Sequence, residues 1–249
     1  MIKKLTLISF ILLAMVNFTK AQNWGGGIDD ETINFGFTFQ YVSSEYKIVK
    51  KRDWRQPFYD PGLGTYVTDQ LSAVSSPPSV GFGIGFVVNG NISSNVDLRF
   101  TPTLVFNDRL IKYDYVIPGT INPTNPSIEK KYQATMVEFP LGLKIKSDRL
   151  MNFRAYMLGG LKYSADLASD KKTNDADAAP IDKLIKNKKG FLSYEAGLGF
   201  DIYFEYFKMS PEFKLSYSFN DVLKHDVSPY ANPIERAKLR HFTFSLFFE

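Results

Sequence analysis

Apolar and polar residues alternate along eight segments of the chain. In the segment 194–207, YEAGLGFDIYFEYF, apolar side chains such as Leu198 and Phe200 take even positions, while Glu195 and Asp201 take odd ones. Alternation over ten or more residues indicates a β-strand with one apolar face and one polar face. The eight strands predicted in this way are residues 32–42, 80–89, 95–107, 133–146, 152–165, 191–204, 208–219 and 239–248.

The connections between these segments alternate between long and short. An up-and-down membrane barrel that starts on the periplasmic side requires this order, because its periplasmic turns are short and its extracellular loops are long. A soluble β-sandwich has no reason to place every long loop at one end. The long connections are residues 43–79, 108–132, 166–190 and 220–238, and the short ones are 90–94, 147–151 and 205–207.

The polar faces of the predicted strands carry five positive and five negative charges near their middle. Equal numbers predict a plug of ion pairs and not a conduction path of one sign. Eight strands enclose an interior just wide enough for side chains to fill it. We therefore expect structural pairs such as Glu138 with Lys144 and Glu195 with Arg154. The ten residues of this predicted lumen ion-pair network are Asp97, Arg99, Glu138, Lys144, Arg154, Lys162, Glu195, Asp201, Glu212 and Lys214.

These patterns predict an all-β fold, an eight-stranded antiparallel up-and-down transmembrane β-barrel with short periplasmic turns and long extracellular loops. Its apolar face meets lipid, and closure of the sheet leaves no unpaired strand edge in the membrane. Aromatic residues near strand ends, such as Tyr41 and Phe248, fit the girdles of such barrels. The alternative is a soluble barrel or sandwich that turns the apolar face inward.

The first residues have the layout of a secretory signal peptide. Lys3 and Lys4 precede the apolar stretch 5–16, and the segment ends with Ala21. The apolar stretch is too short to span a membrane as a helix, which takes about 20 residues. We predict a cleaved signal peptide (1–21), a short periplasmic N-terminal segment (22–31) and an outer-membrane barrel (32–249).

Composition narrows the classes of function. The 249 residues carry a net charge of +4, but the predicted signal peptide holds Lys3, Lys4 and Lys20 and no acidic residue. The mature chain therefore carries about +1, which argues against a nucleic-acid partner. The chain has no cysteine, which excludes thiol catalysis and a disulfide framework.

The sequence lacks the common patterns of catalytic and metal-binding residues. His225 and His241, its two histidines, have no metal-ligand spacing, and no GxSxG elbow occurs. We expect no enzyme activity, no cofactor and no metal. An outer-membrane lipid enzyme is an alternative that needs His241 on the lipid side, whereas the register of the last strand points His241 into the lumen.

The long connections hold further candidate sites and structure. Residues 111–133 predict an extended hairpin with IPGTINPTNP at its tip, and residues 181–186 predict a helical turn. A basic run in 43–79 is a candidate surface-recognition loop for lipid phosphates or a partner, and the alternative is a solvated loop. Its residues are Lys47, Lys50, Lys51 and Arg52.

Three segments carry a family resemblance. EFPLGLKIKSDR (138–149) resembles a strand of the small outer-membrane barrels that are common in Bacteroidetes. RAYMLGGLKYSADLAS (154–169) and GLGFDIYFEYFKMSPEFKLSYS (197–218) resemble the PorT family more specifically. The PorT family belongs to the type IX protein secretion system, which is tied to gliding motility in gliding species.

The resemblance implies a non-enzymatic integral outer-membrane component that is needed for protein export. It implies no catalytic residues. The implied partners are outer-membrane lipid and lipopolysaccharide, and other subunits of the secretion machine, including a larger translocon barrel beside which this one docks. The alternative is an architectural or lipid- or ligand-binding small outer-membrane barrel that belongs to another assembly machine.

Overall fold

The computed structural model describes residues 31–116, 127–167 and 178–249. The predicted signal peptide (1–21) lies outside the described residues, as does all of the predicted periplasmic segment (22–31) except Glu31. Within the described residues, no helix has the length and apolar character needed to cross a membrane.

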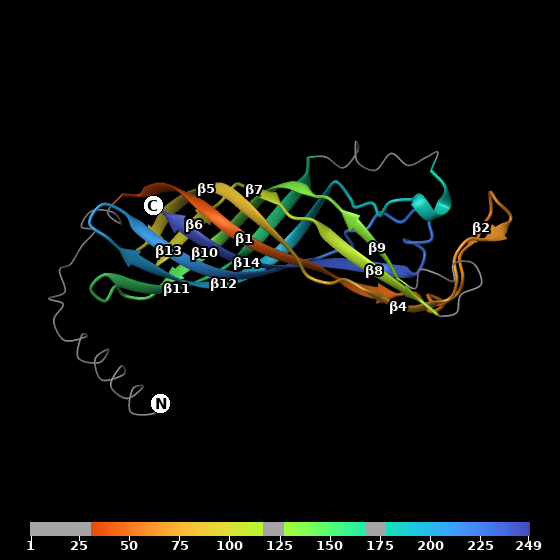
Figure 1. Cartoon of the computed structure of the whole chain (residues 1–249). Helices are drawn as coiled ribbons and strands as arrows, with labels where there is room; N and C mark the ends of the chain where they lie inside the picture. Colours follow the sequence, from red (N-terminus) through yellow and green to blue (C-terminus); the bar gives the residue numbers. More distant parts are fainter. Residues whose placement is uncertain (1–30, 117–126, 168–177) are drawn as a thin grey trace, which may run out of the picture.

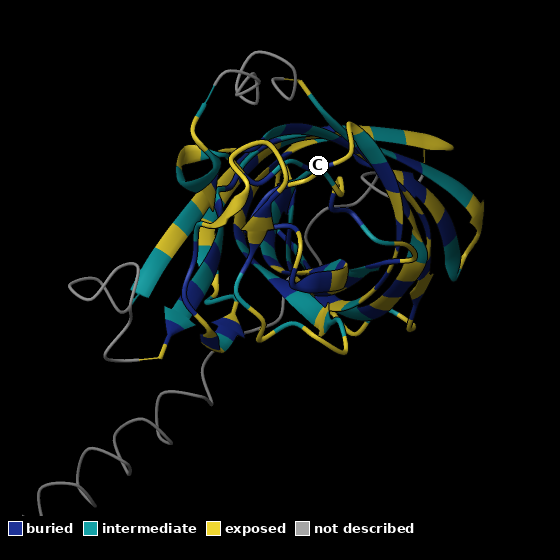
Figure 2. Cartoon of the chain, turned by 90° about the vertical axis from the view of Figure 1, so that its right-hand side faces the viewer, coloured by how far each residue is buried: buried dark blue, intermediate teal, exposed yellow. Residues whose placement is uncertain are grey.

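The main sheet is an antiparallel barrel whose strands form a closed ring (Figures 1 and 2). The ring closes because β1 pairs with β14 on one side and with β5 on the other. Each remaining strand pairs with its neighbours in chain order. The barrel strands are β1 (Ile33–Lys50), β5 (Ser79–Ser93), β6 (Val96–Phe100), β7 (Thr103–Phe106), β10 (Thr135–Lys146), β11 (Phe153–Asp166), β12 (Gly190–Tyr203), β13 (Lys208–Ser218) and β14 (Ile234–Phe248).

Strands β6 and β7 together fill one of the eight positions in the ring, since both lie between β5 and β10. The predicted single strand 95–107 is therefore interrupted, at Thr101 and Pro102. Neither Pro102 nor Pro140, which lies in the neighbouring β10, has a backbone N–H for the ladder. The break keeps two hydrogen bonds, from Thr101 N to Pro140 O (3.1 Å) and from Phe86 N to Pro102 O (3.0 Å).

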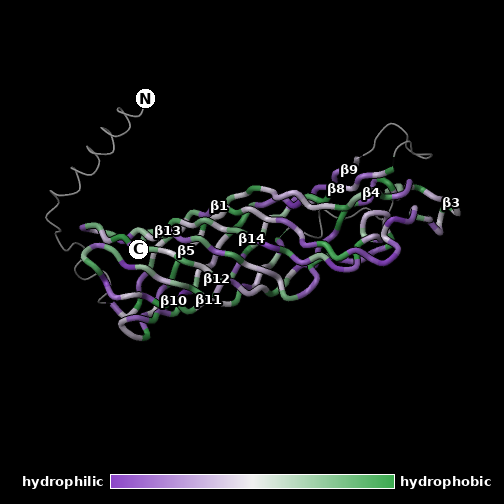
Figure 3. Tube along the Cα trace, turned by 90° about the horizontal axis from the view of Figure 1, so that it is seen from below, coloured by the Kyte–Doolittle hydropathy of each residue, from purple (hydrophilic) through white to green (hydrophobic). Residues whose placement is uncertain are grey.

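Burial alternates along the barrel strands as the fold requires. Phe35 and Phe86 on the outer wall are 70% and 72% exposed, whereas Lys144 in the lumen is fully buried. Figure 2 shows buried and exposed positions alternating around the ring, and Figure 3 shows the matching alternation of hydropathy along the tube. The predicted eight-stranded up-and-down barrel, with its apolar face outward, is confirmed.

Three strands continue four or more residues beyond the bounds predicted for them. β1 ends at Lys50, eight residues past the predicted end, and β14 begins at Ile234 instead of residue 239. β5 extends to Ser93. Figure 1 shows β1 and β14 running from the short-turn end of the barrel to the end that carries the long connections, which we call the loop end.

Small sheets cover the loop end. The predicted hairpin is present as β8 and β9, and β4 pairs with β8 to make a three-stranded sheet, while β2 and β3 form a separate hairpin. The hairpin tip (117–126) lies outside the described residues. The predicted helical turn (181–186) is helical only at its first two residues, which belong to a 3₁₀ turn that begins at Pro180. These elements are β2 (Tyr59–Asp60), β3 (Thr65–Tyr66), β4 (Leu71–Ser75), β8 (Arg109–Tyr115), β9 (Ser127–Tyr132) and η1 (Pro180–Asp182).

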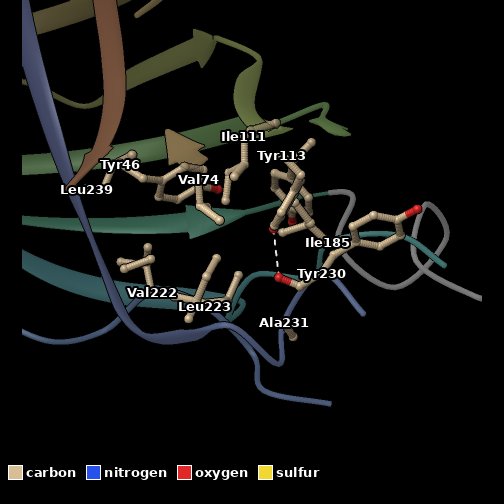
Figure 4. Close-up of a cluster of buried hydrophobic side chains, with 14 of the residues drawn as sticks. Tyr46, Val74, Ile111, Tyr113, Ile185, Val222, Leu223, Tyr230, Ala231 and Leu239 are labelled. Carbon is tan, nitrogen blue, oxygen red and sulfur yellow. Dashed lines mark hydrogen bonds between the residues drawn. The ribbon is translucent and has the colours of Figure 1, made fainter. Parts of the chain in front are cut away.

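A cluster of buried apolar and aromatic side chains fills the loop end (Figure 4). The Tyr113 hydroxyl donates a hydrogen bond to Tyr230 O (2.7 Å), and the two rings meet edge to face at 5.3 Å. We call this cluster the loop-end core. Its labelled members in Figure 4 are Tyr46, Val74, Ile111, Tyr113, Ile185, Val222, Leu223, Tyr230, Ala231 and Leu239.

The loop-end core should be stabilised independently of the barrel wall. Ile111 is fully buried in it, so Ile111→Ala should destabilise this end by about 2–5 kcal/mol. Amide hydrogen exchange should increase in β8 and β9, while β12 and β13 stay protected. Lys112→Ala, on the exposed side of the same strand, is the matched control. Equal exchange in the two variants would contradict an independent core.

The same end should loosen at alkaline pH. Burial, with a smaller contribution from Asp69, raises the pKa of Tyr115 to about 12. The unfolded phenol titrates near pH 10, so the folded state keeps its proton more tightly. This contribution to stability is complete below pH 10 and is lost as the pH rises towards 12. Hydrogen exchange of β8 between pH 9 and 12 measures it, and Tyr115→Phe should reduce the pH-dependent increase.

Candidate functional site

The most concentrated group of functional side chains lies inside the barrel, on inward positions of six strands. Lys144 on β10 and Asp201 on β12 form its centre: Lys144 Nζ lies 2.7 Å from both carboxylate oxygens. The Ser210 hydroxyl donates to Asp201 Oδ1 at 2.6 Å. Lys144 also lies 4.0 Å above the ring of Tyr156, which comes from β11 between the two strands. All four side chains are buried.

Arg99 makes a second group towards the short-turn end. Its two terminal nitrogens contact Glu212 (3.1 Å) and Glu249 (3.0 Å). The Tyr156 hydroxyl donates to the same Glu212 oxygen, at 3.0 Å. Lys208 completes the group through its ion pair with Glu249 (2.8 Å). Charge-assisted contacts of this kind are the strong ones available to buried charges.

A third group lies higher in the lumen. Lys162 Nζ is 2.9 Å from Glu138, and the Ser164 hydroxyl donates to the other oxygen of Glu138 at 3.2 Å. His241 Nδ1 lies 3.2 Å from Lys162 Nζ and 3.5 Å from Glu138. Only 2% of His241 is exposed, so its imidazole faces the lumen and not lipid. This placement removes the geometric basis of a lipid enzyme built on His241.

The remaining pairs link these groups to the wall. Lys214 contacts Glu195 at 3.2 Å, and Asp97 pairs with Lys146 at 2.6 Å while accepting a hydrogen bond from Asn89 (3.1 Å). Opposite charges therefore meet at every level of the lumen that these residues occupy. The arrangement neutralises buried charge. These last two pairs join neighbouring strands, whereas the pairs of Lys144 and Arg99 join strands across the lumen.

Nine of the ten residues predicted for the lumen network are buried inside the barrel. Arg154 is the exception: it is half-buried and lines a depression at the short-turn end with Asn91 and Lys146. Both expected pairings are wrong. Lys144 pairs with Asp201 and not with Glu138, and Glu195 pairs with Lys214 and not with Arg154. Alternation along a strand shows which side chains face the lumen. Which of these charges lie at the same height along the barrel axis depends on the stagger between neighbouring strands, which alternation does not reveal.

Three lumen charges were absent from the predicted network: Lys146, Lys208 and Glu249. Each continues the inward parity of its strand, β10, β13 or β14. They lie at strand ends, whereas the predicted network consists of charges near the middle of each polar face. Glu249 directly follows the end of the last predicted strand, and its side chain is fully buried.

The predicted surface-recognition loop is partly a strand. Lys47 and Lys50 belong to β1, and only Lys51 and Arg52 follow it. Lys50 Nζ lies 4.1 Å above the ring of Trp54. The other contacts are from Lys47 to Glu45 (2.7 Å) and from Lys51 to the Asn232 side chain (3.4 Å).

The lumen offers no metal site in the part of the chain that the structure describes, since no three His, Asp or Glu residues there could hold an ion together. The acidic residues of the lumen are engaged by lysine and arginine. The chemistry that this arrangement supports is structural neutralisation of buried charge.

Comparison with known proteins gives a family match and a set of distant structures. The family model described as outer membrane protein beta-barrel domain matches residues 16–224. No curated protein sequence matches the chain.

Among the solved structures that resemble this one is the outer membrane protein OprG from Pseudomonas aeruginosa (15% identity, 87% of this chain and 92% of that one, TM-score 0.43). Neisserial surface protein A, NspA, shares 9% identity (87% and 98%, TM-score 0.39). Ail, the attachment invasion locus protein of Yersinia pestis, shares 8% (86% and 96%, TM-score 0.35).

Removing one partner of the central ion pair should lower the free energy of unfolding strongly, whereas replacing both partners with apolar residues should change it little. Lys144→Met leaves Asp201 buried without its cation, and should destabilise the barrel by about 3–5 kcal/mol. The double variant Lys144→Met/Asp201→Leu should be much closer to the unchanged protein, because no buried charge is left alone. Urea unfolding of the refolded barrel in lipid vesicles measures both.

Arg154→Gln, at the half-buried charge near the barrel end, is the control and should cost less than Lys144→Met. If Lys144→Met and the double variant unfold at the same urea concentration, the network does not act through charge neutralisation.

Proposed function

The chain belongs to the outer membrane protein beta-barrel domain family, and from this premise we propose that it is a non-enzymatic accessory barrel of the type IX protein secretion machinery. The family places the protein in the outer membrane. We propose that its short turns face the periplasm and its loop end faces outward, as is usual for such barrels. In the proposed role it docks beside a larger translocon and passes no cargo itself.

One observation carries the choice of an accessory over a channel: the lumen is crossed by buried ion pairs. Lys144 with Asp201 and Arg99 with Glu212 join strands that are not neighbours in the ring. An eight-stranded interior is just wide enough for such side chains, so it leaves no space for a polypeptide. The surfaces left for a function are the outer wall and the loop end.

The segments that resemble the PorT family support the secretion role and indicate a face. Residues 154–169 and 197–218 supply most of β11, half of β12 and all of β13, which lie side by side in the ring. Their outer wall holds an apolar depression of about 560 Å³. Gly159 and Ala196 form its floor, opposite one another in the β11–β12 register. Small residues allow close packing between membrane proteins, so we propose that this wall contacts the larger barrel.

Deletion of the gene in the source organism tests the proposed role. Type IX cargo should accumulate in the periplasm, while other outer-membrane proteins keep their normal amounts, as measured by mass spectrometry of the two fractions. Complementation with Lys144→Met/Asp201→Leu should restore export, because the lumen carries nothing. Gly159→Leu/Ala196→Leu fills the depression and should fail to restore export despite normal membrane insertion.

Val80→Leu is the matched control, since Val80 is exposed on β5, on the opposite side of the ring. It should complement fully. Normal cargo export in the deletion strain would overturn the secretion role and leave an architectural or lipid-binding barrel of another assembly machine.

A further inference from the structure

Cations are aligned on the outward face of β1 and β14, directly beyond the apolar wall. Tyr41 on β1 and Phe242 on β14 are the last exposed aromatic residues of that wall towards the loop end. Beyond them the register pairs Glu45 with Arg240, Lys47 with Lys238, and Val49 with Arg236. We call the four cations of this arrangement the basic ladder: Lys47, Arg236, Lys238 and Arg240.

The basic ladder is unfavourable by itself. Lys47 and Lys238 are directly opposite one another across the two strands, and like charges in that position destabilise a sheet. Glu45 is shared by Lys47, at 2.7 Å, and Arg240. One carboxylate therefore serves cations on both strands, and it stands between the apolar wall and the Lys47–Lys238 pair. An anion bound from outside would remove the remaining repulsion.

The position of the ladder selects the kind of anion. Arg240 is two residues beyond Phe242, which at about 3.3 Å per residue and a tilt near 40° puts it about 5 Å further from the membrane centre. Lys238 is about 10 Å beyond. The polar layer of each leaflet is roughly 5–7 Å thick, and lysine and arginine side chains bend towards it. Arg240 thus lies at the headgroups of the outer leaflet, the side chains of Lys47 and Lys238 reach back to them, and Arg236 lies further out.

We propose that the basic ladder binds the phosphorylated sugar headgroup of an outer-leaflet glycolipid. The phosphate oxygens accept charge-assisted hydrogen bonds from Lys47, Lys238 and Arg240. The acyl chains of the same molecule lie against the aromatic wall below, where Phe242 and Phe244 pack with Phe213 of β13. Charge above and apolar surface below suit a phosphorylated lipid better than a free anion. The inference depends on the outer-membrane location and not on the secretion role.

Binding of lipid A to the full-length mature barrel in detergent micelles tests this inference. The probe is bisphosphorylated lipid A, compared with the same lipid after removal of both phosphates and with inorganic phosphate. Native mass spectrometry counts the bound lipid. We expect bisphosphorylated lipid A to bind, and Lys47→Gln/Lys238→Gln to weaken it about 25-fold, or about fivefold for each cation removed.

Two further variants separate a site from general attraction. Lys112→Gln/Lys224→Gln removes two exposed cations of the loop end that lie off the ladder, and should leave the affinity unchanged. Glu45→Gln frees Lys47 and Arg240 from their carboxylate, and should strengthen binding several-fold. Heat-modifiable migration on gels checks that each variant is folded.

Three outcomes would overturn the inference. Equal binding of dephosphorylated lipid A would mean that the headgroup charge is not recognised. Displacement of the lipid by equimolar inorganic phosphate would indicate a site for a free anion. Equal weakening by the ladder variant and the control variant would mean that net charge alone attracts the lipid.

Discussion

The structure depends on one constraint, the absence of hydrogen-bonding partners for the backbone in hydrocarbon. A sheet that crosses a membrane must close on itself, because an open edge would leave N–H and C=O groups unpaired. Closure is achieved here when β1 pairs with both β14 and β5. A ring of eight positions then has a narrow interior, and the inward side chains must satisfy one another. Buried lysine, arginine and carboxylate groups meet that need only as pairs, such as Lys144 with Asp201.

Beyond the membrane the same strands reverse their polarity. At membrane level Phe39 and Tyr41 of β1 face outward, while Thr38 and Gln40 face inward. Six residues after Gln40, Tyr46 is buried inside and belongs to the loop-end core. Water can surround the outer face of this part of the barrel, so apolar side chains gain by turning inward. One strand therefore serves two interiors, a polar one within the membrane and an apolar one outside it.

This reversal explains what could and could not be predicted from the sequence. Eight strands, their order and the outward apolar face follow from alternation, which is unambiguous where lipid lies on one side. The alternation in β1 changes parity near Val42, so the predicted strand ended there although the backbone continues to Lys50. Alternation also identifies the residues that face the lumen. It does not predict how they pair, because Glu138 and Lys144 share a strand but lie at different heights in the barrel, and the stagger between strands does not follow from alternation.

The same change of parity places Lys47 and its neighbours on a surface instead of in a loop. A basic run in a loop can adopt many conformations. Cations in register on two strands keep a fixed spacing, so they lose little conformational entropy on binding. The basic ladder lies on β1 and β14, and the apolar depression lies mainly on β11, β12 and β13, with Phe242 of β14 also in its lining. The acyl chains that we place against Phe213 and Phe242 therefore run along the edge of the depression, because both side chains line it. In the proposed arrangement the lipid lies beside the surface that contacts the larger barrel, and neither contact involves the sealed lumen.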